Sequence, residues 1–179
     1  LQFVDQGDFL HYPRPLADDV RACEGAGVEV VYMPTASAMY PDGFATTVHV
    51  AGLTDTMEGT SRPGHFDGVA TVVAKLFAAT RPHVAVFGEK DFQQLAIVRR
   101  MTVDLDLGIE IVGHPTIREP DGLAMSSRNR RLSEAQRRAA VCMPLALAAG
   151  CTAAASGVTD TAGIILAVTR VVESEPLAE

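Results

Sequence analysis

The chain has 179 residues, in which 22 acidic side chains outnumber 15 basic ones and give a formal net charge of -7. This balance argues against general nucleic-acid binding, which usually requires a basic face. No apolar run approaches the length of a membrane span and no signal peptide is visible, so we expect a cytoplasmic protein with no membrane partner. Three cysteines without C-x-x-C spacing argue against a disulfide framework or a zinc site.

Helical and strand-like patterns alternate along the first two thirds of the chain. The segment 15–27 has apolar side chains at helical spacing and acids in its first turn. Further along, the sequence predicts strands over 28–34, 46–52, 83–87 and 109–113, and helices over 68–80 and 91–107. Such alternation indicates an α/β fold with a parallel sheet. Strands this apolar are expected to be covered on both faces.

The alternating pattern of helices and strands ends at Pro115, which suggests a domain boundary near Thr116. Residues 1–116 carry this alternating pattern of helices and strands. Residues 117–179 open with a polar, glycine-containing connector and continue as helices. We therefore expect a larger α/β domain followed by a smaller, mainly helical one.

The helices of the second part have recognisable start and stop signals. Ser133 with Gln136 three residues later predicts a capping box. Pro144 is expected to kink or split the alanine-rich helix that follows, and Gly157 is expected to end it. Thr159 is then the expected N-cap of a last helix.

The segment Gly88 to Asp91 follows an apolar strand directly. In an open parallel sheet, ligands bind beyond the carboxyl ends of strands, where the next helix points its first amide groups. Gly88 allows close approach of a ligand, Lys90 supplies a point charge, and Asp91 is a natural N-cap. One of the two glutamines that follow should reach into the crevice. A phosphate site and a solvated turn with a capping aspartate both fit this pattern.

Three other segments carry chemically useful side chains. "GLAMSSRN" offers two hydroxyls and the planar fork of Arg128 for phosphate, although a polar loop is the alternative. "SRPGHF" places Arg62 and His65 on a loop before a helix, where a plain turn is the alternative. The acid pair Asp18 and Asp19 fits helix-start electrostatics better than a metal site.

Taken together and in one collinear order, these motifs resemble the pantoate–β-alanine ligase family. The resemblance covers nearly the whole chain. It implies a Rossmann-like sheet of the nucleotidyltransferase type and a smaller helical or α+β C-terminal lid domain. The matching segments are Gln2-Phe3, Tyr12-Pro13-Arg14, 39–43, Arg62-Pro63, His65-Phe66, 88–94 and 121–129.

The resemblance also implies a reaction. Pantoate's carboxylate attacks the α-phosphate of ATP in the presence of Mg²⁺, and the amine of β-alanine then attacks the pantoyl adenylate. The products are pantothenate, AMP and pyrophosphate, in coenzyme A biosynthesis, and the enzyme is expected to be a homodimer. Two alternatives are a nucleotidyltransferase-like enzyme for another acid or RNA, and a non-catalytic nucleotide-binding protein.

Residue roles follow from the same resemblance. Gln2 and Gln94 are expected to hold pantoate, and Gln2 to lie near β-alanine as well. The expected ATP contacts are Gly88, Glu89, Lys90, Asp91, Ile117, Met125, Ser126, Ser127 and Arg128, of which Lys90, Ser126, Ser127 and Arg128 are the catalytic candidates. The remaining expectations are Tyr12, Arg62 and His65 as site-lining residues and Asp18 and Asp19 as outer metal ligands.

One departure from the family pattern is the H-x-G-H motif, which this chain lacks and which should lie upstream of Leu1. We therefore expect the 179 residues to be part of a longer protein. Alone they should be weakly stable and inactive, because one face of the central sheet would be left uncovered.

Overall fold

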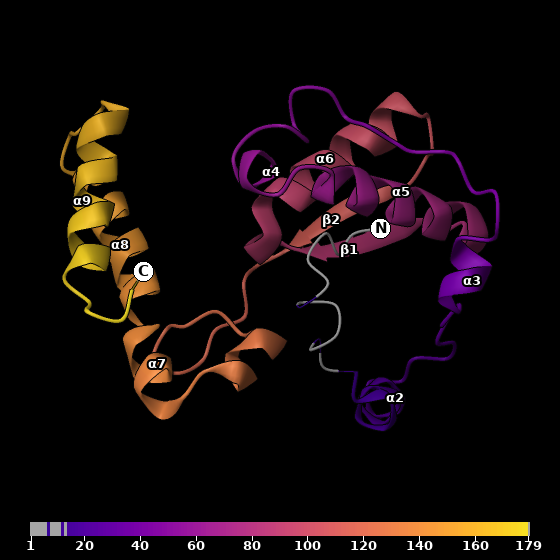
Figure 1. Cartoon of the computed structure of the whole chain (residues 1–179), viewed down its shortest axis with the longest axis horizontal. Helices are drawn as coiled ribbons and strands as arrows, with labels where there is room; N and C mark the ends of the chain where they lie inside the picture. The colour runs from indigo at the N-terminus through magenta and orange to yellow at the C-terminus, as the bar shows by residue number, and fades with distance from the viewer. Residues whose placement is uncertain (1–6, 8–11, 13, 179) are drawn as a thin grey trace. The chain divides into compact units, whose positions relative to one another are not determined.

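The computed structural model describes residues 7, 12 and 14–178. The chain divides into two compact units, with the boundary in the sequence between Pro115 and Thr116. The first unit contains the sheet and the second is helical (Figure 1).

A βαβ arrangement forms the centre of the first unit. Strand β1 (Val84–Gly88) leads through the short 3-10 helix η1 (Glu89–Asp91) into α6 (Phe92–Asp104), which returns the chain to strand β2 (Glu110–His114). The two strands pair in parallel, with Val84 opposite Glu110 and Gly88 opposite His114. The predicted α/β fold with a parallel sheet is thereby confirmed.

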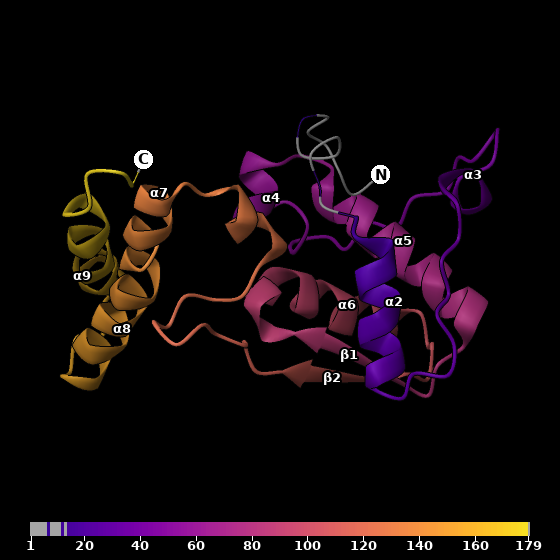
Figure 2. The ribbon, with the colours of Figure 1, turned by 90° about the horizontal axis from the view of Figure 1, so that it is seen from below.

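The core lies between this sheet and two helices, α5 (His65–Thr80) and α6, which cover the same face of the sheet (Figure 2). Ile97 and Val98 of α6 are fully buried, and Met101 is almost so. Phe77 of α5 meets Phe87 of β1 edge-to-face, with ring centroids 6.2 Å apart. Apolar side chains at helical spacing therefore fix where the end of β1 points.

The opposite face of the sheet is open among the described residues. Val84, Val86 and Val112 alternate with the core-facing residues, and 49%, 62% and 37% of their surfaces are exposed. Coverage on both faces, as apolar parallel strands predict, is therefore not found in the described residues, whereas the expectation that these 179 residues leave one face of the sheet uncovered is confirmed, because α5 and α6 lie on one side only. The stability of the chain remains a prediction.

Two predicted strands, 28–34 and 46–52, are not strands in the structure. A strand is defined by its hydrogen-bonding partner, and within the described residues the sheet contains β1 and β2 only. In the second segment, the amide of Val48 donates to the Thr71 hydroxyl of α5 at 2.9 Å, and Val50 enters the core. That segment is therefore held by a helix instead of a neighbouring strand.

Between residue 14 and the core helix α5, the described chain forms α2 (Leu16–Gly25), α3 (Ala36–Met39) and α4 (Glu58–Ser61). Helix α2 has no buried residue, whereas α3 buries Met39 and α4 buries Gly59. Helix α4 ends a loop that runs over α5 and α6 and bears directly on the candidate site.

The second unit begins at Thr116 with a small hairpin and continues with the 3-10 helix η2 (Ser127–Arg131), α7 (Glu134–Ala139), α8 (Cys142–Ala155) and α9 (Thr161–Glu173). The predicted capping box at the start of α7 is confirmed. The helix splits before Cys142, so Pro144 sits in the first turn of α8, where its missing amide hydrogen costs no bond. The N-cap of α9 is Asp160, which accepts from the Gly163 amide at 2.7 Å, and not Thr159 as predicted.

Helices α8 and α9 pack closely at Gly150. A β-carbon there would lie 2.8 Å from Cγ2 of Val168, so the absence of a side chain allows this approach. By length and composition alone, the stretch Glu134–Ala155 is long and apolar enough to cross a membrane. In this structure α8 instead packs against α9 and is preceded by a break in the helix.

Candidate functional site

The end of β1 and the turn after it carry four predicted site residues, Gly88, Glu89, Lys90 and Asp91, of which Glu89 is exposed. Lys90 donates to the Asp91 carboxylate, with Nζ and Oδ1 2.9 Å apart, and both side chains are substantially exposed. Gly88 has φ -71, an ordinary extended conformation, and a β-carbon on it would meet nothing within 4 Å. Its backbone therefore does not require glycine, and the open space beside it is compatible with a ligand.

Asp91 occupies the N-cap position of α6, as predicted, but its side chain makes no capping hydrogen bond. The predicted capping role is wrong because Lys90 binds the carboxylate instead. The first amide groups of an α-helix lack intrahelical partners, and those of α6 follow directly from the end of β1. A lysine beside such amides can attract an anion.

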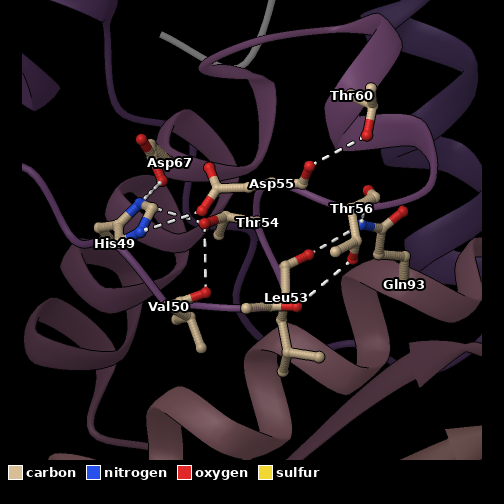
Figure 3. Close-up of polar contacts among 10 residues, drawn as sticks. His49, Val50, Leu53, Thr54, Asp55, Thr56, Thr60, Asp67 and Gln93 are labelled. Atoms are coloured by element: carbon tan, nitrogen blue, oxygen red, sulfur yellow. Dashed lines mark hydrogen bonds and ion pairs between the residues drawn. The ribbon is translucent and has the colours of Figure 1, made fainter.

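The next two residues of α6 behave differently from each other. Gln93 is 8% exposed and its side-chain amide binds the loop before α4 (Figure 3). Nε2 donates to the carbonyls of Leu53 and Thr56 at 2.8 and 2.7 Å, and Oε1 accepts from the Glu58 amide at 3.1 Å. Gln94 is half-buried and is the glutamine that remains a candidate for a ligand.

Arg62 and His65 come together where α4 leads into α5. The Arg62 guanidinium donates to the Glu58 carboxylate at 2.7 Å, and its Nη1 lies 3.5 Å from Nε2 of His65. Both residues are half-buried. A partly desolvated guanidinium with one carboxylate partner can also take an acidic ligand.

A histidine that the sequence did not single out anchors the other end of the same loop. Nδ1 of His49 lies 2.9 Å from the Asp67 carboxylate and 3.1 Å from the Thr54 hydroxyl, and Nε2 lies 3.4 Å from Asp55 (Figure 3). The loop from residue 49 to residue 58 is therefore tied to α5 by His49 and to α6 by Gln93. Both partners are distant in sequence, so periodicity gives no signal for them.

The two predicted outer metal ligands, Asp18 and Asp19, are neighbours on an exposed helix. Asp18 and Asp19 lie in the first turn of α2, where the Asp18 carboxylate pairs with Arg21. Residues 7, 12 and 14–178 contain no group of three or more His, Cys, Asp or Glu suited to a metal ion. Tyr12, a predicted lining residue, is half-buried, and Gln2, the predicted pantoate and β-alanine contact, lies outside the described residues.

In the second unit, a small hairpin brings Ile117 and Met125 together. The Met125 amide donates to the Ile117 carbonyl at 2.9 Å, and the chain bridges again between Arg118 and Ala124. Ile117 is 57% and Met125 50% exposed. Two neighbouring apolar side chains on the surface suit a flat, apolar ring such as a nucleobase.

The serines and arginine that follow begin a short 3-10 helix. The Ser126 hydroxyl accepts from the Arg128 amide at 3.2 Å, so Ser126 caps η2, while Ser127 and Arg128 are exposed. Asn129 donates to the Ala124 carbonyl at 3.0 Å and fixes the turn to the hairpin. Such a turn offers hydroxyl and guanidinium donors from a single stretch of backbone.

An ion pair holds the hairpin to α7. Arg137 Nη1 donates to Asp121 Oδ2 at 2.7 Å, and this hydrogen bond, with a second from the Leu123 amide, lowers the pKa of the Asp121 carboxyl. The hydrogen bond to Asp121 in turn raises the pKa of the Arg137 guanidinium. The hairpin that precedes Ser126 and Arg128 is thus attached to α7.

The βαβ unit, with a lysine and a helix start at the carboxyl end of β1, is typical of an α/β protein that binds a ligand beyond the ends of its parallel strands. The family model described as pantoate-beta-alanine ligase matches residues 1–178. The chain belongs to the pantoate-beta-alanine ligase family.

Individual relatives agree with this assignment. The pantothenate synthetase of Mycolicibacterium smegmatis is 55% identical over 157 residues, which are 88% of this chain and 50% of that protein. The Heliobacterium modesticaldum enzyme is 51% identical and covers 99% of the chain, which spans 63% of its length. The chain thus spans between half and two thirds of these two relatives.

Solved structures extend the comparison to the fold. Pantothenate synthetase from Thermus thermophilus superposes with a TM-score of 0.93 at 47% identity, over 98% of this chain and 64% of that one. The ligase from Francisella tularensis, solved with a beta-gamma ATP compound and beta-alanine, gives a TM-score of 0.80 at 30% identity, over 96% of this chain and 64% of its own.

Proposed function

We propose that the protein condenses pantoate with β-alanine at the expense of ATP, through a pantoyl adenylate. One observation carries this proposal: Lys90 of η1 and Gln94 of α6 lie four residues apart just beyond the carboxyl end of β1, within a family match over residues 1–178. That position supplies a cation for a phosphate and a neutral hydrogen-bonding arm for an acid. The relative from Francisella tularensis, which was solved with an ATP compound and beta-alanine, supports the same substrates.

In the first step, a carboxylate oxygen of pantoate forms a bond to the α-phosphorus of ATP. The bond from that phosphorus to the bridging oxygen breaks, and pyrophosphate leaves. An anion attacks a polyanion, so charge opposes the step until cations offset it. We assign this role to the two cations that the family resemblance singles out, Lys90 and Arg128. Lys90 must exchange its Asp91 partner for phosphate, which costs little for an exposed pair.

Neutral groups are assigned to the acid substrate. Gln94, with Gln2, orients pantoate without neutralising its attacking carboxylate. Arg62 and His65 line this side of the site, and Tyr12 completes the lining.

The adenylate and the phosphates are assigned to the second unit. Ile117 and Met125 receive the adenine, while Ser126 and Ser127 donate to phosphate oxygens beside Arg128. Because Ser126 caps η2 in this structure, its hydroxyl hydrogen remains available as a donor while the oxygen accepts from the Arg128 amide.

In the second step, the amine nitrogen of β-alanine attacks the acyl carbon of the adenylate. A carbon–nitrogen bond forms, the acyl carbon–oxygen bond to AMP breaks, and the amine gives up a proton. In this proposal Mg²⁺ enters with the phosphates of ATP, since Asp18 and Asp19 do not provide a metal site by themselves. We also propose a homodimer, which sedimentation equilibrium tests.

The test is isotope exchange between pyrophosphate and ATP in the complete gene product. We expect exchange that requires pantoate and does not require β-alanine. Lys90→Ala should lower its rate by roughly two to three orders of magnitude. Lys75→Ala is the matched control, because Lys75 lies over the Phe44 ring, 4.7 Å from its centroid, and should leave the rate unchanged. Exchange without pantoate, or equal rates in the two variants, overturns the proposal.

A further inference from the structure

We propose that Gln93 is a positioning residue for the acid substrate, an inference that rests on the proposed function. Its side chain does not reach a ligand but holds the loop 53–58, and through that loop it sets Arg62 relative to Gln94. The two glutamines at the start of α6 would then have different roles: Gln93 holds the loop beside the site, and Gln94 contacts the substrate.

The contacts of Gln93 are the first support. The side chain is 8% exposed, and three loop groups bind it within 3.1 Å: the carbonyls of Leu53 and Thr56 and the amide of Glu58. A buried amide with both ends satisfied by backbone fixes that backbone strongly, because each lost bond leaves a buried polar group without a partner. The other hydrogen bonds at this end, such as that from the Thr60 hydroxyl to the Asp55 carbonyl at 3.0 Å, lie within the loop and α4 and do not reach α6.

The second support is a continuous chain of contacts from Gln93 toward the site. Gln93 accepts from the backbone of Glu58, the Glu58 carboxylate binds Arg62 at 2.7 Å, and Arg62 lies 3.5 Å from His65. Gln93 and Gln94 are adjacent on α6, so their side chains leave the helix about 100° apart. The same helical turn therefore anchors the loop and presents the neutral arm.

Glutamine is the side chain that this position requires. Two carbonyls need donors and one amide needs an acceptor, and a primary amide of this length offers both. Glutamate would retain the acceptor but would place an oxygen against two carbonyl oxygens. Methionine would fill the same space without either function.

The experiment compares Gln93→Met and Gln93→Glu with wild type and with Thr102→Val in the complete gene product. Thr102→Val is the control because it removes another buried hydrogen bond of α6, from the Thr102 hydroxyl to the Val98 carbonyl at 2.7 Å, away from the loop. Two quantities are measured: hydrogen exchange of the Glu58 amide, and KM for pantoate and kcat in pyrophosphate exchange.

We expect Gln93→Met, which removes the acceptor of the Glu58 amide, to raise exchange of that amide about tenfold, and both variants to raise the KM for pantoate about tenfold with kcat little changed, since lost ground-state positioning appears in KM. Thr102→Val should change neither quantity. The inference is overturned if KM for pantoate stays at the wild-type value, if the loss falls on kcat alone, if glutamate supports wild-type KM, or if Thr102→Val has the same effect. If the wild-type protein shows no pantoate-dependent pyrophosphate exchange, the proposed function is refuted as well. If the wild type is active and the Gln93 variants behave like it, only this inference is refuted.

Discussion

Gly59 gives the sharpest test of how the loop before α4 is packed. A β-carbon on Gly59 would lie 2.0 Å from the carbonyl oxygen of Thr54 and 2.8 Å from its carbonyl carbon. Side-chain carbons essentially never come within 3.0 Å of such atoms, so Gly59→Ala has to move backbone by about 1 Å. The neighbouring atoms are main chain and cannot rotate away. We expect a loss of about 2 to 3 kcal/mol in the free energy of unfolding, as for other overpacked sites.

Urea unfolding followed by circular dichroism measures this loss. Gly25→Ala is the matched control: Gly25 ends α2, and a β-carbon there meets nothing within 4 Å. That substitution should be neutral or slightly stabilising, because alanine favours helix over glycine. The displaced loop should also show faster amide exchange at Glu58. If Gly59→Ala unfolds at the same urea concentration as wild type, the close approach of Gly59 and Thr54 does not exist in solution and the described loop is wrong.

Three further predictions concern other contacts. Because hydrogen bonding to Arg137 depresses the pKa of Asp121, their pair should stabilise the second unit at neutral pH and lose that effect as the pH falls through the depressed pKa; unfolding curves of wild type and Asp121→Asn should therefore differ at pH 7 and converge in acid. His49→Ala should cost less than about 1 kcal/mol in urea unfolding, since its contact with Asp67 is half-exposed. Met101→Ala should cost about 2 to 5 kcal/mol in the same assay, because the side chain is 1% exposed.

The elements that sequence predicted well are those with both periodicity and a local terminator. Helix α6 has buried apolar side chains at positions 95, 97, 98 and 101, which is helical spacing, and it follows closely on β1. Its position and type could therefore be predicted from the sequence. The capping box of Ser133 likewise needs only two residues, three apart. These signals are contained in a short window and survive any tertiary arrangement.

The failures lie where the outcome depends on a distant partner. The β-branched segment 28–34 has the composition of a strand, yet no described strand pairs with it, and Val30 remains 79% exposed. The role of Gln93 depends on three backbone groups 35 to 40 residues earlier. Composition can indicate that a residue is able to form such bonds, but not which backbone will come within reach.

The candidate site residues share a property that only the structure reveals: most of them already have a partner inside the protein. Lys90 is bound to Asp91, Arg62 to Glu58, and the Ser126 hydroxyl to an amide of its own turn. Each partner orients a polar group in advance and lowers the entropy cost of placing it on a ligand. Each also has to be given up or shared when phosphate or carboxylate arrives. Because these pairs are partly exposed, their exchange costs little, and ligand charge can replace them one for one. By contrast, the three bonds of Gln93 are shielded from water and are not exchanged, which separates the groups that hold the site from the groups that act in it.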